Sequence, residues 1–262
     1  MTTVETGARL HFGFQNLSLA RPRLYGGIGV GLREPRLVVE AEPAAAVDCA
    51  DDAVEPYLRG AIDALGVEGA RVTVQERFPR HVGLGSGTQL ALACLTAVAR
   101  THGMAVSSRE VAPQLGRGGR SGVGVATFER GGFVVDIGHP TARFTTDTPE
   151  RGTWDVPPVL GRWTLPQDWR FVLVIPEDYE RRGPSGEGED RQIRAAVERA
   201  DPEIADEIAT LLTRRLLPAV VDGHPGRFGQ AVTRLGRLNG AWYADEQGGV
   251  YRPPVGDVVA SL

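Results

Sequence analysis

Residues 79–89 read Pro-Arg-His-Val-Gly-Leu-Gly-Ser-Gly-Thr-Gln, which places three glycines and two hydroxyl side chains in one short loop. A strand-like segment at 70–75 precedes this loop, and an unbroken apolar run at 90–100 predicts a helix directly after it. Glycine lets a backbone approach a ligand closely, and a helix start offers unpaired amides and the positive end of a dipole. We therefore expect a phosphate or diphosphate site here. The alternative is a plain turn, with Ser86 or Thr88 as the helix N-cap.

Three segments together make up the predicted binding surface. The first is the loop itself, and the second is a glycine-rich turn expected at 25–32. The third is a glycine-rich loop at 115–124, where two arginines could clamp a phosphate bidentately. The residues assigned to phosphate or substrate binding are Gly83, Leu84, Gly85, Ser86, Gly87, Thr88, Gln89, Gly26, Gly27, Arg117 and Ser121.

The amino-acid composition indicates a globular protein and argues against several other classes. The 262 residues are 42% hydrophobic and 24% charged, which is an ordinary globular balance. The net charge of −4 argues against a nucleic-acid partner. No apolar run reaches the roughly 18 residues of a membrane span, and the N-terminus lacks a signal-peptide pattern. We expect a cytoplasmic enzyme that acts on small molecules, with no nucleic-acid or membrane partner.

The chain contains no lysine, so all 29 basic side chains are arginine. This excludes a Schiff-base lysine, a lysine general base and the P-loop lysine. Any phosphate clamp must therefore combine arginine side chains with backbone amides.

Hydrophobic patterning predicts an α+β architecture in two parts. We expect a phosphate-binding domain over residues 1–150 and a mainly helical second domain over 168–262, separated by an irregular segment at 140–168. Arg130-Gly131 is expected to turn a hairpin. The predicted strands are 6–14, 36–41, 70–75, 126–129, 132–137 and 170–175, and the predicted helices are 56–65, 90–100, 190–199, 202–220 and 225–241.

The unit of strand, Pro79 loop and helix resembles the GHMP superfamily of small-molecule kinases. The resemblance implies a two-domain α+β sandwich. Its first domain would be of the ribosomal protein S5 domain 2-like type, with a left-handed βαβ crossover, and its second an α/β domain. Kinases of this superfamily that use a catalytic base carry an Asp after Ser-Gly-x. Here Ser121-Gly122-Val123 is followed by Gly124, and glycine cannot accept a proton from a hydroxyl.

Four stretches together resemble one branch of this superfamily, the β-ribofuranosylaminobenzene 5′-phosphate synthases. They are 9–14 (Arg-Leu-His-Phe-Gly-Phe), 25–29 (Tyr-Gly-Gly-Ile-Gly), 83–89 and 118–124. The resemblance implies a transferase that condenses phosphoribosyl pyrophosphate with 4-aminobenzoate or 4-hydroxybenzoate and releases CO₂ and pyrophosphate. This is an early step of tetrahydromethanopterin synthesis, so archaea or bacteria with that carrier are implied, as is a homodimer.

The implied chemistry assigns further roles. Mg²⁺ is expected with the pyrophosphate, held by Ser86 and Asp136, and no organic cofactor is expected. The catalytic candidates are His11, Arg9, Arg120 and Asp136. His11 would act as acid/base or hydrogen-bond donor, and it shares a strand face with Arg9. Asp190, like Glu187, is expected on a solvated face or as a helix cap.

One expected feature is missing from the sequence. Members of the superfamily carry a third glycine-rich motif near the C-terminus, and residues 238–243 match it poorly. The second domain is therefore predicted to be shortened or to lack its C-terminal strands. Two alternatives stay open: an ATP-dependent kinase of a small alcohol, and a non-catalytic relative that binds a phosphorylated ligand.

Overall fold

The computed structural model describes residues 1–79, 82–147, 149–175, 187–252 and 255–261. Within these ranges one seven-stranded sheet runs in the order β3-β4-β2-β5-β7, and β1 and β6 also pair with β2. All pairings are antiparallel except that of β3 with β4. The strands are β1 (Thr2–Asn16), β2 (Arg23–Pro43), β3 (Val47–Asp48), β4 (Ala70–Glu76), β5 (Phe133–Asp136), β6 (His139–Pro140) and β7 (Val159–Trp163).

Helices cover both sides of the long strands. A π-helical turn, η1 (Leu212–Leu216), continues α6 directly into α7. The helices are α1 (Glu55–Leu65), α2 (Ser86–Thr101), α3 (Ser108–Val111), α4 (Val123–Arg130), α5 (Glu187–Arg199), α6 (Pro202–Leu211), α7 (Leu217–Val221), α8 (Pro225–Trp242), α9 (Ala244–Gln247) and α10 (Val255–Ser261).

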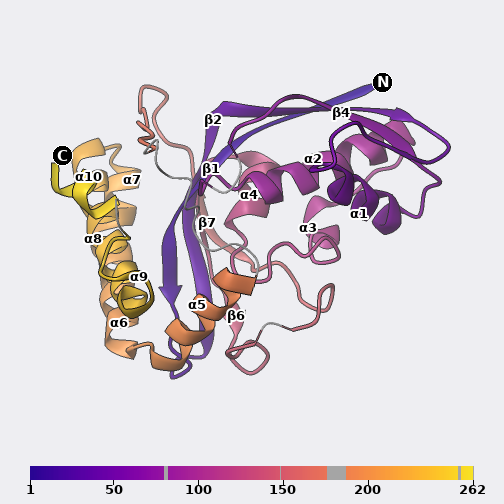
Figure 1. Ribbon diagram of the computed structural model, residues 1–262. Coiled ribbons are helices and arrows are strands. Elements are labelled where there is room, and N and C mark those ends of the chain that lie inside the picture. Colours follow the sequence, from indigo (N-terminus) through magenta and orange to yellow (C-terminus); the bar gives the residue numbers. More distant parts are fainter. Residues whose placement is uncertain (80–81, 148, 176–186, 253–254, 262) are drawn as a thin grey trace.

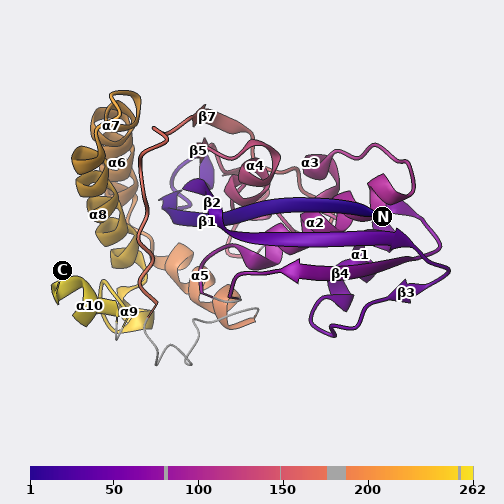
Figure 2. The same cartoon turned by 90° about the horizontal axis from the view of Figure 1, so that it is seen from above.

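Strands β1 and β2 are long and bent, and they pass between two helical layers (Figure 1). Helices α1 to α4 lie on one side, and α6, α7 and α8 lie on the other. The view from above shows β1, β2 and β4 side by side over α1 and α2 (Figure 2). The bend coincides with register shifts of β1 between Gly7 and Arg9 and between His11 and Gly13. Such bulges re-aim side chains, and Arg9 and His11, which lie between the two shifts, both line the cavity described below.

Each helical layer has its own apolar core. One core packs α1 and α2 on the sheet, with Leu58, Leu92 and Leu95 fully buried. The other packs α5 to α8 on the far ends of β1, β2 and β5, with Ile208 and Leu235 at its centre. The site described below lies where these two layers meet.

Most predicted elements are confirmed. The strands at 6–14, 36–41 and 70–75 lie in β1, β2 and β4, and the helix predicted at 56–65 is α1. The three C-terminal helices are α5, the continuous α6–η1–α7, and α8. The two-domain division stays a prediction, and so does the handedness of the crossover. The segment expected to be irregular, 140–168, contributes β7, which pairs with β5.

Three predictions were wrong. The turn expected at 25–32 is part of β2, because its glycines leave room for neighbouring groups: a Cβ on Gly27 would lie 1.9 Å from the Ser121 hydroxyl. The hairpin expected around Arg130 is instead helix α4 followed by β5. The buried strand expected at 170–175 is not a strand, and the Val172 side chain is 86% exposed. Arg80, His81 and most of the charged loop at 180–190 lie outside the described residues.

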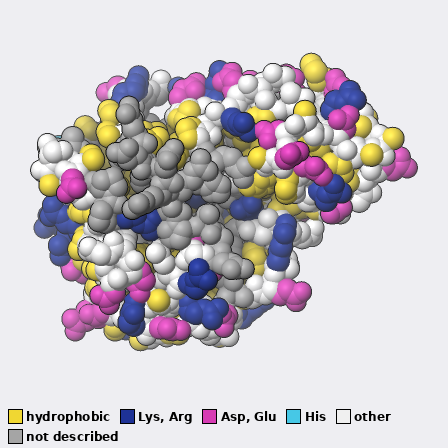
Figure 3. Space-filling view, viewed as in Figure 1, with side chains coloured by type: hydrophobic (Ala, Val, Ile, Leu, Met, Phe, Trp, Pro, Cys, Tyr) yellow, Lys and Arg dark blue, Asp and Glu magenta, His cyan; other side chains and the backbone are white. Residues whose placement is uncertain are grey.

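Acidic and basic side chains are interspersed over the face seen in Figure 3. No described helix is both long enough and apolar enough to span a bilayer.

Candidate functional site

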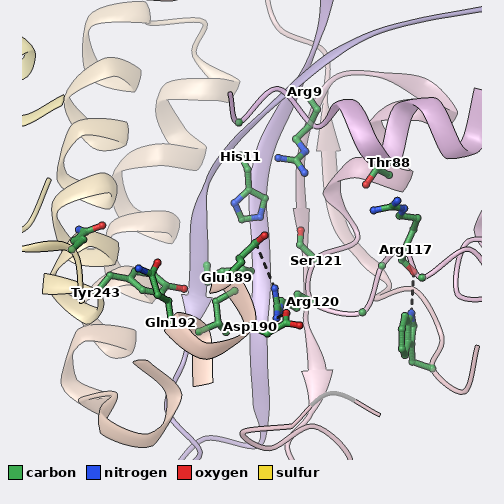
Figure 4. Close-up of a pocket in the computed structure, with 18 of the residues that line it drawn as sticks. Arg9, His11, Thr88, Arg117, Arg120, Ser121, Glu189, Asp190, Gln192 and Tyr243 are labelled. Carbon is green, nitrogen blue, oxygen red and sulfur yellow. Dashed lines mark hydrogen bonds and ion pairs between the residues drawn. The ribbon is translucent and has the colours of Figure 1, made fainter. Parts of the chain in front are cut away.

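A cavity of about 730 Å³ opens between the two helical layers (Figure 4). It collects side chains from β1, from the start of α2, from the loop at 116–121 and from α5, together with residues that follow α8. Seven of the predicted site residues line it: Arg9, His11, Gly83, Thr88, Arg117, Arg120 and Ser121. Segments more than 200 residues apart in the chain thus converge on one site.

The start of α2 forms one wall of the cavity. Gly85 is the N-cap residue and has a left-handed φ of 74°, a conformation that favours glycine. No described side chain caps the helix, so neither Ser86 nor Thr88 plays the N-cap role of the plain-turn alternative. Arg9 N donates to the Leu84 carbonyl over 2.9 Å, which fixes β1 against the loop. The uncapped helix start therefore keeps the anion-binding character expected from the sequence.

Two arginines flank this first helical turn. The position that a Cβ would take on Gly85 lies 3.1 Å from Arg9 Nε, and the same position on Gly87 lies 3.5 Å from Arg117 Nη1. The Arg117 guanidinium also lies 5.6 Å from the centre of the Tyr57 ring. The Nε atoms of Arg9 and Arg117 are buried and have no hydrogen-bond partner among the described residues. Unpartnered buried donors are rare in native proteins, so these two point to a ligand that accepts from them.

Arg120 joins the two helical layers. Its guanidinium forms ion pairs with Glu189, at 3.5 Å, and with Asp190, both in the first turn of α5. Asp190, expected on a solvated face, therefore lines the cavity instead. Figure 4 shows these three side chains close to one another, below His11 in the view.

His11 lies between Arg9 and the acidic pair (Figure 4). Burial, followed by the charge of Arg9, lowers the pKa of His11 from 6.5 to about 3. The imidazole is therefore neutral at physiological pH. Its Nε2 is buried without a partner among the described residues. A neutral ring with a free nitrogen suits hydrogen bonding to a ligand better than donation of a proton from an imidazolium.

The loop that carries Arg117 and Arg120 is held by three anchors. Trp154 Nε1 donates to the Arg117 carbonyl over 2.9 Å, and His139 Nε2 donates to the Gly118 carbonyl over 3.0 Å. Asp136 is the third anchor: its carboxylate accepts from Gly122 N at 2.8 Å, from the Ser121 hydroxyl at 3.1 Å and from Gly138 N at 2.9 Å.

Asp136 does not fit the role of metal ligand predicted for it. Its side chain is fully buried and does not line the cavity, and its oxygens already accept several hydrogen bonds. Burial raises its pKa, against the opposing effect of those donors. The structure therefore places Asp136 beneath the loop, where it acts through Ser121 and Gly122.

Other predicted contacts also lie away from the cavity. Gln89 is buried: its side-chain oxygen accepts from the Thr6 hydroxyl over 2.7 Å, and its nitrogen donates to the Gly124 carbonyl over 3.0 Å. It therefore ties together β1, α2 and α4. Ser86, the other predicted metal ligand, borders a separate small apolar hollow next to Phe78 and Leu90. The remaining predicted residues that do not line the cavity are Leu84, Gly85, Gly87, Gly26 and Gly27.

Several residues that line the cavity could not be singled out from sequence patterns. Phe14, Trp154, Gln192 and Tyr243 each resemble ordinary core or surface positions in the sequence. The one usable signal for this side of the cavity was the acidic pair Glu189 and Asp190 in the first turn of an amphipathic helix. These two residues lie 69 and 70 positions after Arg120, with which they pair. An ion pair between residues so far apart in the sequence depends on the tertiary fold, which cannot be predicted from local sequence patterns.

We expect His139 to make folding stability depend on pH. Burial lowers its pKa from 6.5 to about 4, so the folded ring stays neutral where the unfolded ring binds a proton. Stability must then fall as the pH drops from about 6.5 to 4, by up to about 1.4 kcal/mol per pH unit for this one group, and level off below 4.

Urea unfolding of wild type and His139→Gln between pH 4 and 8 measures this contribution. The difference in the free energy of unfolding between wild type and His139→Gln should shrink by the stated slope as the pH falls. A difference that is independent of pH would contradict the assignment. His224→Gln, at the exposed N-cap of α8, serves as the control.

Comparison with known proteins places the chain in a family. Residues 51–132 match the model described as GHMP kinases N terminal domain. The chain is 36% identical over 250 residues to a beta-ribofuranosylphenol 5′-phosphate synthase of Methanothermobacter thermautotrophicus, covering 88% of this chain and 74% of that protein. It is 33% identical over 248 residues to the Archaeoglobus fulgidus protein of the same name, covering 91% and 76%.

Solved structures agree on the fold alone. Streptococcus pneumoniae phosphomevalonate kinase superposes with a TM-score of 0.62 at 12% identity, covering 97% of this chain and 82% of that one. Methanococcus jannaschii mevalonate kinase superposes with a TM-score of 0.57 at 12% identity, covering 92% and 78%. The predicted α+β fold of the GHMP type is thereby confirmed, and the chain belongs to the beta-ribofuranosylphenol 5′-phosphate synthase family of the GHMP kinase superfamily.

Proposed function

We propose that this protein transfers the phosphoribosyl group of phosphoribosyl pyrophosphate to 4-hydroxybenzoate, with release of CO₂ and pyrophosphate. The observation that carries the proposal is the pair of arginines on either side of the α2 start, whose Nε atoms have no partner in the described part of the chain. Two guanidinium groups and a helix dipole suit a doubly charged diphosphate. The family relationship supplies the reaction class.

The bond changes of this reaction balance without an external base. The bond between the anomeric carbon and the pyrophosphate oxygen breaks, and its electron pair leaves with pyrophosphate. The ring carbon that bears the carboxylate then bonds to the anomeric carbon. Loss of CO₂ returns an electron pair to the ring, so no proton leaves the attacked carbon.

This balance accounts for Gly124, which stands where many kinases of the superfamily carry their base. A carboxylate at this position would have no proton to remove. The position is also crowded, because a Cβ on Gly124 would lie 3.1 Å from Thr88 Cγ2. Both facts weigh against the kinase alternative, in which a substrate hydroxyl must lose its proton.

The proposed roles follow from position. Arg9, Arg117 and the α2 amides hold the diphosphate of the donor, and Arg120 with Ser121 borders the ribose. Positive charge develops at the anomeric carbon as pyrophosphate leaves, and the carboxylates of Glu189 and Asp190, which line the same cavity, can stabilise it. His11 is neutral, and its Nε2 has no partner among the residues that the structure describes, so it can donate or accept a hydrogen bond without changing charge.

Mg²⁺ fits this site when it arrives with the diphosphate. The described residues contain no cluster of three or more His, Cys, Asp or Glu arranged to hold a metal by themselves. Glu189 and Asp190 are the carboxylates that line the cavity, and one or two carboxylates plus phosphate oxygens are the usual Mg²⁺ set. The ion would neutralise charge on the departing pyrophosphate. These two residues thus replace Ser86 and Asp136 as the proposed ligands.

The choice of acceptor rests on the relatives. Both Methanothermobacter and Archaeoglobus proteins are named for a ribofuranosylphenol product. A phenol product requires a hydroxyl opposite the new carbon bond, so 4-hydroxybenzoate is the acceptor that we propose rather than 4-aminobenzoate. The cytoplasmic location and the homodimer remain predictions.

Release of labelled CO₂ tests the proposal. The protein is incubated with Mg²⁺, phosphoribosyl pyrophosphate and carboxyl-labelled 4-hydroxybenzoate, and we expect label in the gas phase only when the donor is present. Ser86→Ala should release CO₂ at the wild-type rate because Ser86 borders a different hollow. Arg117→Ala should lose about 100-fold or more in rate, the scale of a lost charged contact to a reacting phosphate. ATP-dependent phosphorylation without CO₂ release would identify a kinase instead.

A further inference from the structure

The cavity has two chemically different ends. Thr88 and Arg117 lie at the end beside α2, whereas Gln192 and Tyr243 lie at the opposite side, with Arg9 and His11 between them (Figure 4). Phe14 and Ile193 also line the cavity, and Phe14 contacts the His11 ring. Arg252, another lining residue, donates to Gln192 Oε1 over 3.4 Å at the far end. The ring of an aromatic acceptor packs well against aromatic and aliphatic side chains such as Phe14 and Ile193.

The side chain of Tyr243 lies at this far end. The side chain is half-buried, and its hydroxyl makes no hydrogen bond to any residue that the structure describes. Burial raises the pKa of Tyr243, against the opposing charge of Arg120, so the phenol stays protonated at neutral pH. A protonated phenol can both donate a hydrogen bond and accept one.

Asn239, one helical turn before Tyr243, clamps β1 against α8. Phe14 N donates to Asn239 Oδ1 over 2.7 Å, and Asn239 Nδ2 donates to the Phe14 carbonyl over 3.1 Å. Gly13 makes this approach possible, because its φ is +143° and a Cβ there would lie 2.5 Å from Asn239 Cγ. The clamp holds the backbone of Phe14, whose ring meets the edge of His11 at 5.0 Å between centroids.

We propose that Phe14, Ile193 and Tyr243 form the subsite for the aromatic acceptor, with Tyr243 bonded to its para hydroxyl. Asn239 is then a positioning residue that fixes the distance between the two walls. This inference rests on the proposed function. It also gives a role to residues 238–243, the segment that matched the expected third motif poorly.

Geometry sets the direction of the acceptor. The ring carbon that bears the carboxylate must face the anomeric carbon of a donor held by Arg9 and Arg117. The para substituent lies at the opposite end of a benzene ring, so it points away from those arginines. Tyr243 lies at that end of the cavity, and its hydroxyl has no hydrogen-bond partner among the described residues.

Tyr243→Phe removes only the proposed hydrogen bond. We expect the KM for 4-hydroxybenzoate to rise about fivefold, the scale of one neutral hydrogen bond, with the KM for phosphoribosyl pyrophosphate unchanged. Tyr251→Phe, a nearby tyrosine that does not line the cavity, should leave both constants unchanged. An unchanged acceptor KM, or a raised donor KM, would overturn the assignment of Tyr243.

Binding without turnover separates this inference from the proposed function. Saturation-transfer NMR of 4-hydroxybenzoate, with Mg²⁺ and pyrophosphate present, should show ring contact with wild type and a marked loss with Asn239→Ala. Asn239→Asp keeps an acceptor for Phe14 N, so we expect it to bind 4-hydroxybenzoate at an intermediate level. This second variant keeps the test valid if Asn239→Ala fails to fold. A wild-type protein that releases no CO₂ refutes the proposed function. An active protein whose ring contact is unaffected by both Asn239 variants refutes the subsite alone.

Discussion

Arg9→Met is expected to lower kcat/KM sharply while leaving the melting temperature unchanged or higher. Arg9 lies beside the α2 start, where its Nε is buried and without a partner among the described residues. Its guanidinium would contact the diphosphate directly, so its loss should lower kcat/KM by about 100- to 1000-fold, comparable to the loss of one preorganised charge-stabilising donor.

Stability should move in the opposite direction because the ligand-free protein buries this charge poorly. Burial lowers the pKa of Arg9 to about 10, and the charge of Glu189 offsets this only in part. Replacing a buried, incompletely paired charge by an apolar side chain of similar length is often neutral or stabilising. A site prepared for an anion thus carries an electrostatic penalty until the anion binds.

Thermal unfolding and the CO₂ assay, performed on the same preparations, measure the two effects together. Arg33→Met, an exposed arginine of β2, is the matched control and should change neither quantity. A fall of several degrees in the melting temperature of Arg9→Met would show that Arg9 supports the fold. Wild-type activity in that variant would remove Arg9 from the donor site.

Asp136→Ala should have the largest effect on stability of any single substitution at the site. The substitution leaves Gly122 N, Gly138 N and the Ser121 hydroxyl without their acceptor in the interior. Breaking a buried charged network of this kind costs about 3–5 kcal/mol. The loop that carries Arg117 and Arg120 would lose its anchor, so activity should fall with stability.

Urea denaturation of Asp136→Ala, compared with Asp136→Asn, measures the loss. The asparagine keeps one acceptor oxygen and should lose about half as much stability, because some of the three donors remain paired. Asp155→Ala, an exposed aspartate, should stay within about 0.5 kcal/mol of wild type. If Mg²⁺ stabilised wild type but not Asp136→Asn, Asp136 would be a metal ligand after all.

The fold was predicted well where local patterning and tertiary structure agree. The apolar run after residue 89 predicts α2, and the β-branched residues of 36–41 and 70–75 predict strands that do pair in the sheet. Patterning was wrong where glycines serve packing rather than turns. Glycines at 26–31 continue β2 because neighbouring groups occupy the space of their missing side chains.

The site was predicted only in its contiguous parts. The loop at 83–89 and the loop at 115–124 are recognisable by their glycine content. Arg9 and His11 are expected on the same face of a strand because they are two residues apart. Roles were misassigned where a polar residue faces inward: Asp136 and Gln89 satisfy backbone groups, which no sequence pattern reveals. The acidic pair of α5 and Tyr243 reach the cavity only because α5 and α8 pack across the sheet.

The burial of Gln89 changes what the seven-residue stretch 83–89 indicates about a protein that contains it. Its amide joins three elements through Thr6 and the Gly124 carbonyl, and it does not line the cavity. The glutamine therefore indicates how β1, α2 and α4 are joined, and not which ligand is bound. Proteins sharing the string Gly-Leu-Gly-Ser-Gly-Thr-Gln should share this junction, whatever molecule each has come to accept.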